Sequence, residues 1–167
     1  EGALDETTNA LQRMRELAIQ ASNATMSGSD QDDLQKEVTQ LMSEIQRIST
    51  ETEFNNTKVL TGAYTAKDFQ VGADANQTIQ LSITGASVAA LGLSGGGATM
   101  SIGAGVGSAT GIATAINQID AALDSISSIR SDLGAYQNRF EAVIANLSNV
   151  SENTAAARSR IMDADIA

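Results

Sequence analysis

The sequence of 167 residues contains no cysteine, histidine, tryptophan or proline. The absence of cysteine excludes disulfide bonds and thiolate chemistry. Because histidine is absent as well, general acid–base catalysis near neutral pH would fall on carboxylates or lysine. The absence of proline favours long helices, since proline is the residue that most strongly interrupts one.

Aromatic residues and long apolar runs are also scarce. The five aromatic residues are Phe54, Tyr64, Phe69, Tyr136 and Phe140. A thick globular core is difficult to build from so few large side chains, whereas helices can pack side by side through Leu, Ile, Val, Met and Ala. No stretch of about 18 apolar residues occurs, so the sequence predicts no membrane-spanning helix.

Basic residues are outnumbered by acidic ones, with 10 Lys and Arg against 20 Asp and Glu and a net charge of −10. This charge repels nucleic acid and anionic membranes, so we expect neither as a partner. The close carboxylate pairs, Asp32 with Asp33 and Asp163 with Asp165, are expected to be helix caps or solvated charges.

Short motifs for metal or phosphate binding are absent or incomplete. DQDD at 30–33 lacks the glycine-centred spacing of a calcium loop. GGG at 95–97 is not followed by the Gly-Lys-Ser/Thr of a phosphate-binding loop. We therefore expect no enzymatic activity, no metal and no cofactor.

Two helices are predicted in the first third of the chain, over residues 3–25 and 30–50. The segment SGSDQDDL at 27–34 separates them, with Gly28 expected to end the first helix and Ser29 to cap the second, paired with Asp32. Apolar residues in the second helix alternate in steps of four and three, which is the spacing of a coiled-coil seam. The seam consists of Leu34, Val38, Leu41, Ile45 and Ile48.

The middle of the chain has a β-like pattern followed by a glycine-rich stretch. FNNTKVLTG at 54–62 predicts a turn and a short strand, and the alternating segments 67–72 and 77–84 predict a hairpin. Residues 85–111 are rich in Gly, Ser and Ala, which is typical of a flexible connector. Within it, Met100 and Ile102 are expected to form one weak strand at most.

The last helix is predicted over about 110 to 163, because apolar residues recur there every seven positions. Such a helix needs partners along its length, and the two earlier helices are too short to cover every face. Part of its apolar surface is therefore expected to be left for another chain or for terminal segments. The repeating positions are Ile112, Ile119, Ile126, Leu133, Phe140, Leu147, Thr154 and Ile161.

The predicted fold is mainly α, an elongated antiparallel helical bundle of two N-terminal helices and one long C-terminal helix with a small β-hairpin region. We expect N-terminal helices over 1–56, the β-hairpin region over 57–84, the link over 85–110, and the long helix over 111–167. The chain opens without Met in a helical pattern and closes on IMDADIA without a glycine cap. We therefore expect it to be a segment of a longer protein.

Several long stretches resemble bacterial flagellin. They are EGALDETTNALQRMRELAIQASN at 1–23, TEFNNTKVL at 52–60, FQVGADANQTI at 69–79, and the run from RSDLGAYQNRF at 130 to DADIA at 167. The similarity covers roughly 1–84 and 115–167. It implies the rod-like inner domain of the filament subunit, lacking both terminal segments, with residues 85–110 in place of outer domains.

The resemblance also implies a function: a secreted structural subunit that self-assembles with other flagellin subunits into the extracellular flagellar filament and serves motility. Without terminal segments, the isolated chain is expected to be monomeric. A hook–filament junction protein of the same helical architecture is the alternative.

A second partner implied by the resemblance is Toll-like receptor 5 of the vertebrate host. The family's receptor-contacting positions match Arg13, Leu17, Glu37, Ile119, Leu123 and Arg139. Periodicity alone favours core packing for Ile119, since it lies on the heptad seam. Arg15 points away from Arg13 and is expected to be a solvated side chain or to pair with a neighbouring carboxylate.

Overall fold

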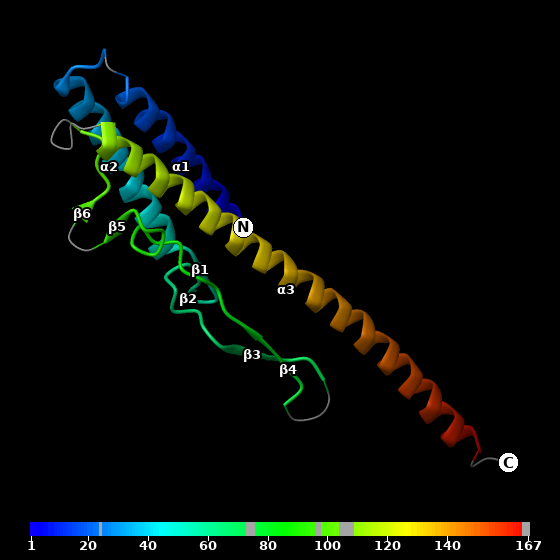
Figure 1. The fold of residues 1–167 in the computed structure, drawn as a ribbon. Coiled ribbons are helices and arrows are strands. Elements are labelled where there is room, and N and C mark those ends of the chain that lie inside the picture. The colour runs from blue at the N-terminus through cyan, green and yellow to red at the C-terminus, as the bar shows by residue number, and fades with distance from the viewer. Residues whose placement is uncertain (24, 73–75, 96–97, 104–108, 165–167) are drawn as a thin grey trace. The chain divides into compact units, whose positions relative to one another are not determined.

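The computed structural model describes residues 1–23, 25–72, 76–95, 98–103 and 109–164. The helices in this part are α1 (Gly2–Ala21), α2 (Gly28–Glu51) and α3 (Ala109–Ala164) (Figure 1). Three antiparallel strand pairs accompany them: β1 (Glu53–Phe54) with β2 (Thr57–Lys58), β3 (Lys67–Gln70) with β4 (Thr78–Leu81), and β5 (Ser94–Gly95) with β6 (Ala98–Thr99). The prediction of a mainly helical fold is confirmed.

The chain forms two compact units, each described separately below. The first contains residues 1–65 and 82–131, and the second contains residues 66–81 and 132–167. Helix α3 contributes its first part to one unit and its second part to the other.

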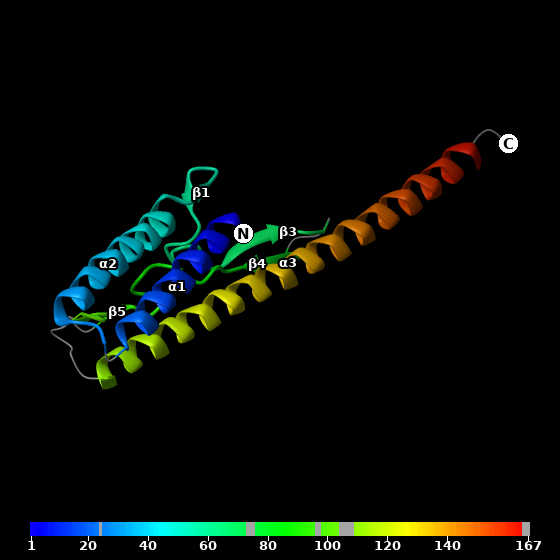
Figure 2. The ribbon, with the colours of Figure 1, turned by 90° about the horizontal axis from the view of Figure 1, so that it is seen from above.

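The first unit is a bundle in which α1, α2 and the first part of α3 lie side by side (Figures 1 and 2). Ion pairs join Arg15 to Asp120 and Asp5 to Arg130, so α1 and α3 run in opposite directions. Apolar side chains at helical spacing fill the space between the helices and exclude water from it. The largest of these buried side chains are Leu4, Leu11, Met14, Leu17, Val38, Ile45, Ile119 and Ile126.

The turn between α1 and α2 differs from the predicted one. Helix α1 ends at Ala21, and α2 begins at Gly28 with Ser27, not Ser29, as its N-cap. Ser27 and Asp30 satisfy each other's backbone N–H groups in a capping box. The earlier start also lets the Gln31 side chain donate to the carbonyl oxygen of Ala21 at 2.9 Å, which satisfies an acceptor at the end of α1.

The buried face of α2 is offset from the predicted seam. Val38 and Ile45 are buried as predicted, but Met42 and Ser49 are buried where Leu41 and Ile48 were expected. Leu41 and Ile48 are half-buried instead. The face is shifted because α2 contacts the segments around Val88 and Ile102 as well as α1, so its core side is broader than a two-helix seam.

The described part of the glycine-rich segment packs against α2, which corrects the expectation of a flexible connector. The backbone N–H of Ile102 donates to Gln35 Oε1 at 2.6 Å, and that of Val88 donates to Gln46 Oε1 at 3.3 Å. Met100 and Ile102 lie in the core but outside the strands, which are β5 and β6. Residues 96–97 and 104–108 of the predicted connector lie outside the described part.

The second unit contains the predicted hairpin and the later part of α3. Strands β3 and β4 pair with Phe69 opposite Ile79. The Phe69 ring packs edge-on against Phe140 of α3, with ring centroids 5.6 Å apart. Further along α3, the seam residues Leu147 and Ile161 are exposed. This agrees with the expectation that part of the long helix stays uncovered.

Candidate binding surface on the helical bundle

Arg13 is the centre of a charged cluster on the first unit. Its Nε donates to Glu37 Oε1 of α2 at 2.8 Å, and its Nη1 donates to Glu16 Oε2, one turn along α1, at 3.1 Å. The hydrogen bond with Glu37, followed by that with Glu16, raises the pKa of Arg13, so its guanidinium stays charged. All three side chains remain substantially exposed and accessible to a partner.

Two of the predicted contact residues lie beneath this surface. Leu17 is 1% exposed and Ile119 is 0% exposed, so both belong to the core between the helices. The periodicity argument for Ile119 is confirmed. In this conformation, neither side chain offers surface to a partner, and both instead hold α1 and α3 in place. Leu123, one turn beyond Ile119, is half-buried.

Arg139 lies on the part of α3 that belongs to the second unit, and its side chain is exposed. Within the first unit, the structure brings Arg13 and Glu37 into contact. The resemblance to flagellin implied these two residues separately, and nothing in the sequence indicated that their side chains would pair.

Two further arginines make ion pairs between α1 and α3 that the sequence did not specify. Arg15 Nε lies 2.7 Å from Asp120 Oδ1, so it is paired rather than merely solvated. Arg130 lies 2.8 Å from Asp5 and 3.2 Å from Glu1. Exposed pairs of this kind contribute little stability, but they specify which residues of the two helices lie opposite each other.

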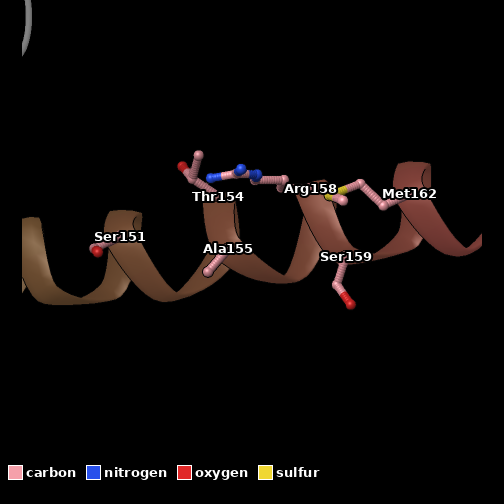
Figure 3. A pocket seen from close by; sticks show the side chains of 6 residues that line it. All are labelled: Ser151, Thr154, Ala155, Arg158, Ser159 and Met162. Carbon is pink, nitrogen blue, oxygen red and sulfur yellow. The ribbon is translucent and has the colours of Figure 1, made fainter.

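Neither a metal site nor a membrane-spanning helix is found among the described residues. They contain no group of three or more side chains suited to holding a metal ion, and none of their helices is long and apolar enough to cross a bilayer. One surface hollow is lined by six residues, all of which project from α3 alone (Figure 3). A single helix provides only one wall, so this hollow encloses no site. Its lining residues are Ser151, Thr154, Ala155, Arg158, Ser159 and Met162.

Comparison with protein families gives two matches that together cover more than half of the chain. Residues 1–65 match the bacterial flagellin N-terminal helical region, and residues 116–167 match the bacterial flagellin C-terminal helical region. The chain belongs to the flagellin family. Membership confirms the resemblance to bacterial flagellin inferred from the sequence motifs. Because the matches reach residues 1 and 167, they give no support to the expectation of missing terminal segments.

Individual flagellins are similar over the entire chain. A flagellin of Halalkalibacterium halodurans is 44% identical over 167 residues, which are 59% of its length. The flagellar filament 30.7 kDa core protein of Treponema maltophilum is 39% identical, and the match covers 61% of it. The chain thus spans about three fifths of the length of these relatives.

Among solved structures, the crystal structure of Bacillus cereus flagellin is similar in fold. Its TM-score is 0.69 at 28% identity, covering 87% of this chain and 80% of that one. This similarity confirms the helical architecture expected from the sequence.

Proposed function

We propose that this chain is a structural subunit of the bacterial flagellar filament, exported from the cell and polymerised with copies of itself for motility. The main support is the pair of flagellin regions at the two ends of the chain, which fold back beside each other in the first unit. Relatives from Treponema maltophilum and Brachyspira hyodysenteriae are flagellar filament core proteins, which favours the filament over the hook–filament junction.

The mechanism in this proposal is packing. Interlocked apolar side chains make each helical bundle stiff, since a close-packed core resists deformation. Lateral contacts between bundles then extend this stiffness along a polymer. In this proposal, residues 1–56 and 111–167 form the helical domain, 57–84 the hairpin region, and 85–110 the place of outer domains.

Gene replacement tests the filament proposal. The gene for this protein is introduced into a bacterium that lacks its own flagellin, and the cells are examined for filaments and for swimming. We expect filaments and restored swimming. Normal export of the subunit without any filament would contradict the proposal. The isolated 167-residue chain is expected to sediment as a monomer, and long polymers at modest concentration would contradict that expectation.

We also propose that the first unit is a ligand for Toll-like receptor 5. The supporting observation is the exposed Arg13–Glu37 pair, because arginine provides several charge-assisted donors and recurs among binding hot spots. Of the other implied contact residues in this unit, Leu123 is half-buried, whereas Leu17 and Ile119 belong to the core; Arg139 is exposed on the second unit.

Arg13→Ala tests the receptor proposal in a reporter-cell assay for Toll-like receptor 5. We expect a loss of signalling potency of about tenfold or more, since the guanidinium is the accessible hot-spot group. Arg15→Ala is the matched control, because it removes an equally charged residue from the same helix, and we expect little change. Equal potency of wild type and Arg13→Ala would reject the proposed site.

A further inference from the structure

Phe54 is the most exposed large apolar side chain in the described part of the chain, at 74%. It lies in the β1–β2 hairpin, where Asn55 and Asn56 have positive φ angles of 49° and 60°. Two consecutive positive φ angles define a type I′ turn, which matches the twist of paired strands. An ion pair of 2.7 Å between Lys58 and Glu53 joins the strands next to the ring. The backbone that carries Phe54 is therefore held in one conformation.

An exposed ring on a fixed turn is typical of a binding anchor. Aromatic side chains are enriched among interface hot spots, and a pre-organised group loses less conformational freedom when it binds. The packing of the first unit gives no other reason for a ring at this position, since most of its surface is in solvent.

A groove of about 400 Å³ lies alongside α2 in the same unit. The groove is open to solvent, so a phenyl side chain can reach it from outside the unit. Met42 and Val88 form an apolar floor, and both are buried. The groove is lined by Thr39, Met42, Ser43, Gln46, Val88 and Ser94.

Polar groups around the groove already form hydrogen bonds within the chain. The Thr39 hydroxyl donates to the carbonyl oxygen of Gln35, and the Ser43 hydroxyl donates to that of Thr39. Gln46 Oε1 accepts from the backbone N–H of Val88. Among the described residues that line the groove, none is charged. An apolar ring over the methionine side chain suits such a surface better than an ion does.

We propose that Phe54 of one copy inserts into the α2 groove of a neighbouring copy in the filament. This inference rests on the filament function proposed above. The exposure of Phe54 shows that the ring does not occupy its own groove. Phe54 and the α2 groove are different surfaces of the same unit. The contact therefore joins unlike surfaces of two copies, which is a head-to-tail arrangement. Repeated contacts of this kind build an open helical polymer when the rotation between copies does not close a ring.

The charges near both surfaces suit an approach between two copies of a chain with net charge −10. Glu53, next to Phe54 in sequence, is paired with Lys58, and Glu44, on the helix that lines the groove, is paired with Arg47. Pairing offsets the like-charge repulsion that would otherwise oppose contact between acidic surfaces.

Cysteine cross-linking tests the contact, because the chain has no natural cysteine. Subunits carrying Phe54→Cys and subunits carrying Thr39→Cys are mixed with wild type, in the form that the cell exports, assembled into filaments and oxidised. A disulfide requires Cβ atoms roughly 3.5–4.5 Å apart. We expect dimers that contain one of each variant. Gln40→Cys is the matched control, exposed and rotated about 100° from Thr39 around α2, and should cross-link far less.

The outcomes separate the contact from the filament function. Filaments in which Thr39→Cys links to Phe54→Cys no better than Gln40→Cys does, or in which neither links, would overturn the contact and leave the filament function standing. A wild-type subunit that forms no filament would remove both.

Phe54→Ala gives a second readout. We expect the critical concentration for polymerisation to rise about tenfold, with the melting temperature of the monomer unchanged because the ring is exposed. Phe54→Leu should recover part of the loss. An unchanged critical concentration for Phe54→Ala would contradict the inference.

Discussion

Ser27 and Asp30 show how two side chains define where α2 begins. The Ser27 hydroxyl accepts from the Asp30 N–H at 3.2 Å, and Asp30 Oδ2 accepts from the Ser27 N–H at 3.0 Å. Each bond satisfies a backbone donor that the helix itself leaves without a partner.

Ser27→Ala is expected to lower the free energy of unfolding by about 1 kcal/mol, since it removes the N-cap acceptor. Ser29→Ala is the control, because it removes only a 2.8 Å hydroxyl contact with Ser27 and leaves the N-cap acceptor in place, so it should change stability less. Chemical denaturation of both variants measures the difference. Equal losses would mean that Ser27 does not determine the start of α2.

The same cap predicts a pH dependence. Hydrogen bonds from the Ser27 hydroxyl and then from its backbone N–H lower the pKa of Asp30 below its usual 3.8. A lowered folded-state pKa adds stability above the unfolded value, and that stability is lost as pH falls through the folded value. Below about pH 4, wild type should therefore lose stability more steeply than Asp30→Asn. Parallel pH profiles would contradict this assignment.

At the scale of elements, α3 has two parts with different surroundings. Ile126 in the first unit is 1% exposed, whereas Ile161 in the second unit is 73% exposed. Both occupy the same heptad position, so periodicity could not distinguish them. The difference arises because α1 and α2 cover only the first part of the repeat.

Ile126→Ala is expected to destabilise the 167-residue chain by about 2–5 kcal/mol, because it leaves a cavity in a close-packed core. Ile161→Ala, the same change on the same helix, should cost less than about 0.5 kcal/mol. Thermal unfolding of the two variants tests the assignment. Similar losses of unfolding free energy at both positions would show that Ile161 is buried, which would contradict its exposure in the structure.

Gly134 lies within the continuous helix α3, and its surroundings give no packing reason for a glycine. A Cβ atom added there would meet nothing within 4 Å, and its φ is not positive. Gly134→Ala should therefore stabilise the chain by about 0.5–1 kcal/mol, since glycine loses the most backbone entropy in a helix. At Gly92 there is also open space, but its φ of +73° disfavours alanine, so Gly92→Ala should destabilise. The melting temperatures of the two variants should shift in opposite directions.

The positions of the helices and strands could be predicted from the sequence far better than the segments that pack against them. Seven-residue repeats identified the three helices, and alternation identified the β3–β4 hairpin, because both signals are local. The packing of Val88 and Ile102 on α2 was missed, since glycine-rich composition masked the apolar residues between the glycines. The prediction of Ser29 as the N-cap of α2 was also wrong, because Ser29 and Asp32 have the same three-residue spacing as Ser27 and Asp30.

At the scale of the whole molecule, the pairs that align α1 with α3 lie far apart in sequence. Arg15 and Asp120 are separated by 105 residues, and Arg130 and Glu1 by 129. No local pattern specifies such pairs, or the contact between Arg13 of α1 and Glu37 of α2. The family's motifs supplied the residues, and packing of the helices brings them together.

Electron cryomicroscopy of filaments from the gene-replacement strain tests whether this bundle is the unit that polymerises. We expect a helical polymer in which each repeat contains α1, α2 and the first part of α3 packed together, with Ile45 and Ile126 in a shared interior. A filament whose repeats lack that three-helix bundle, or cells that export the subunit and form no filament, would contradict this expectation.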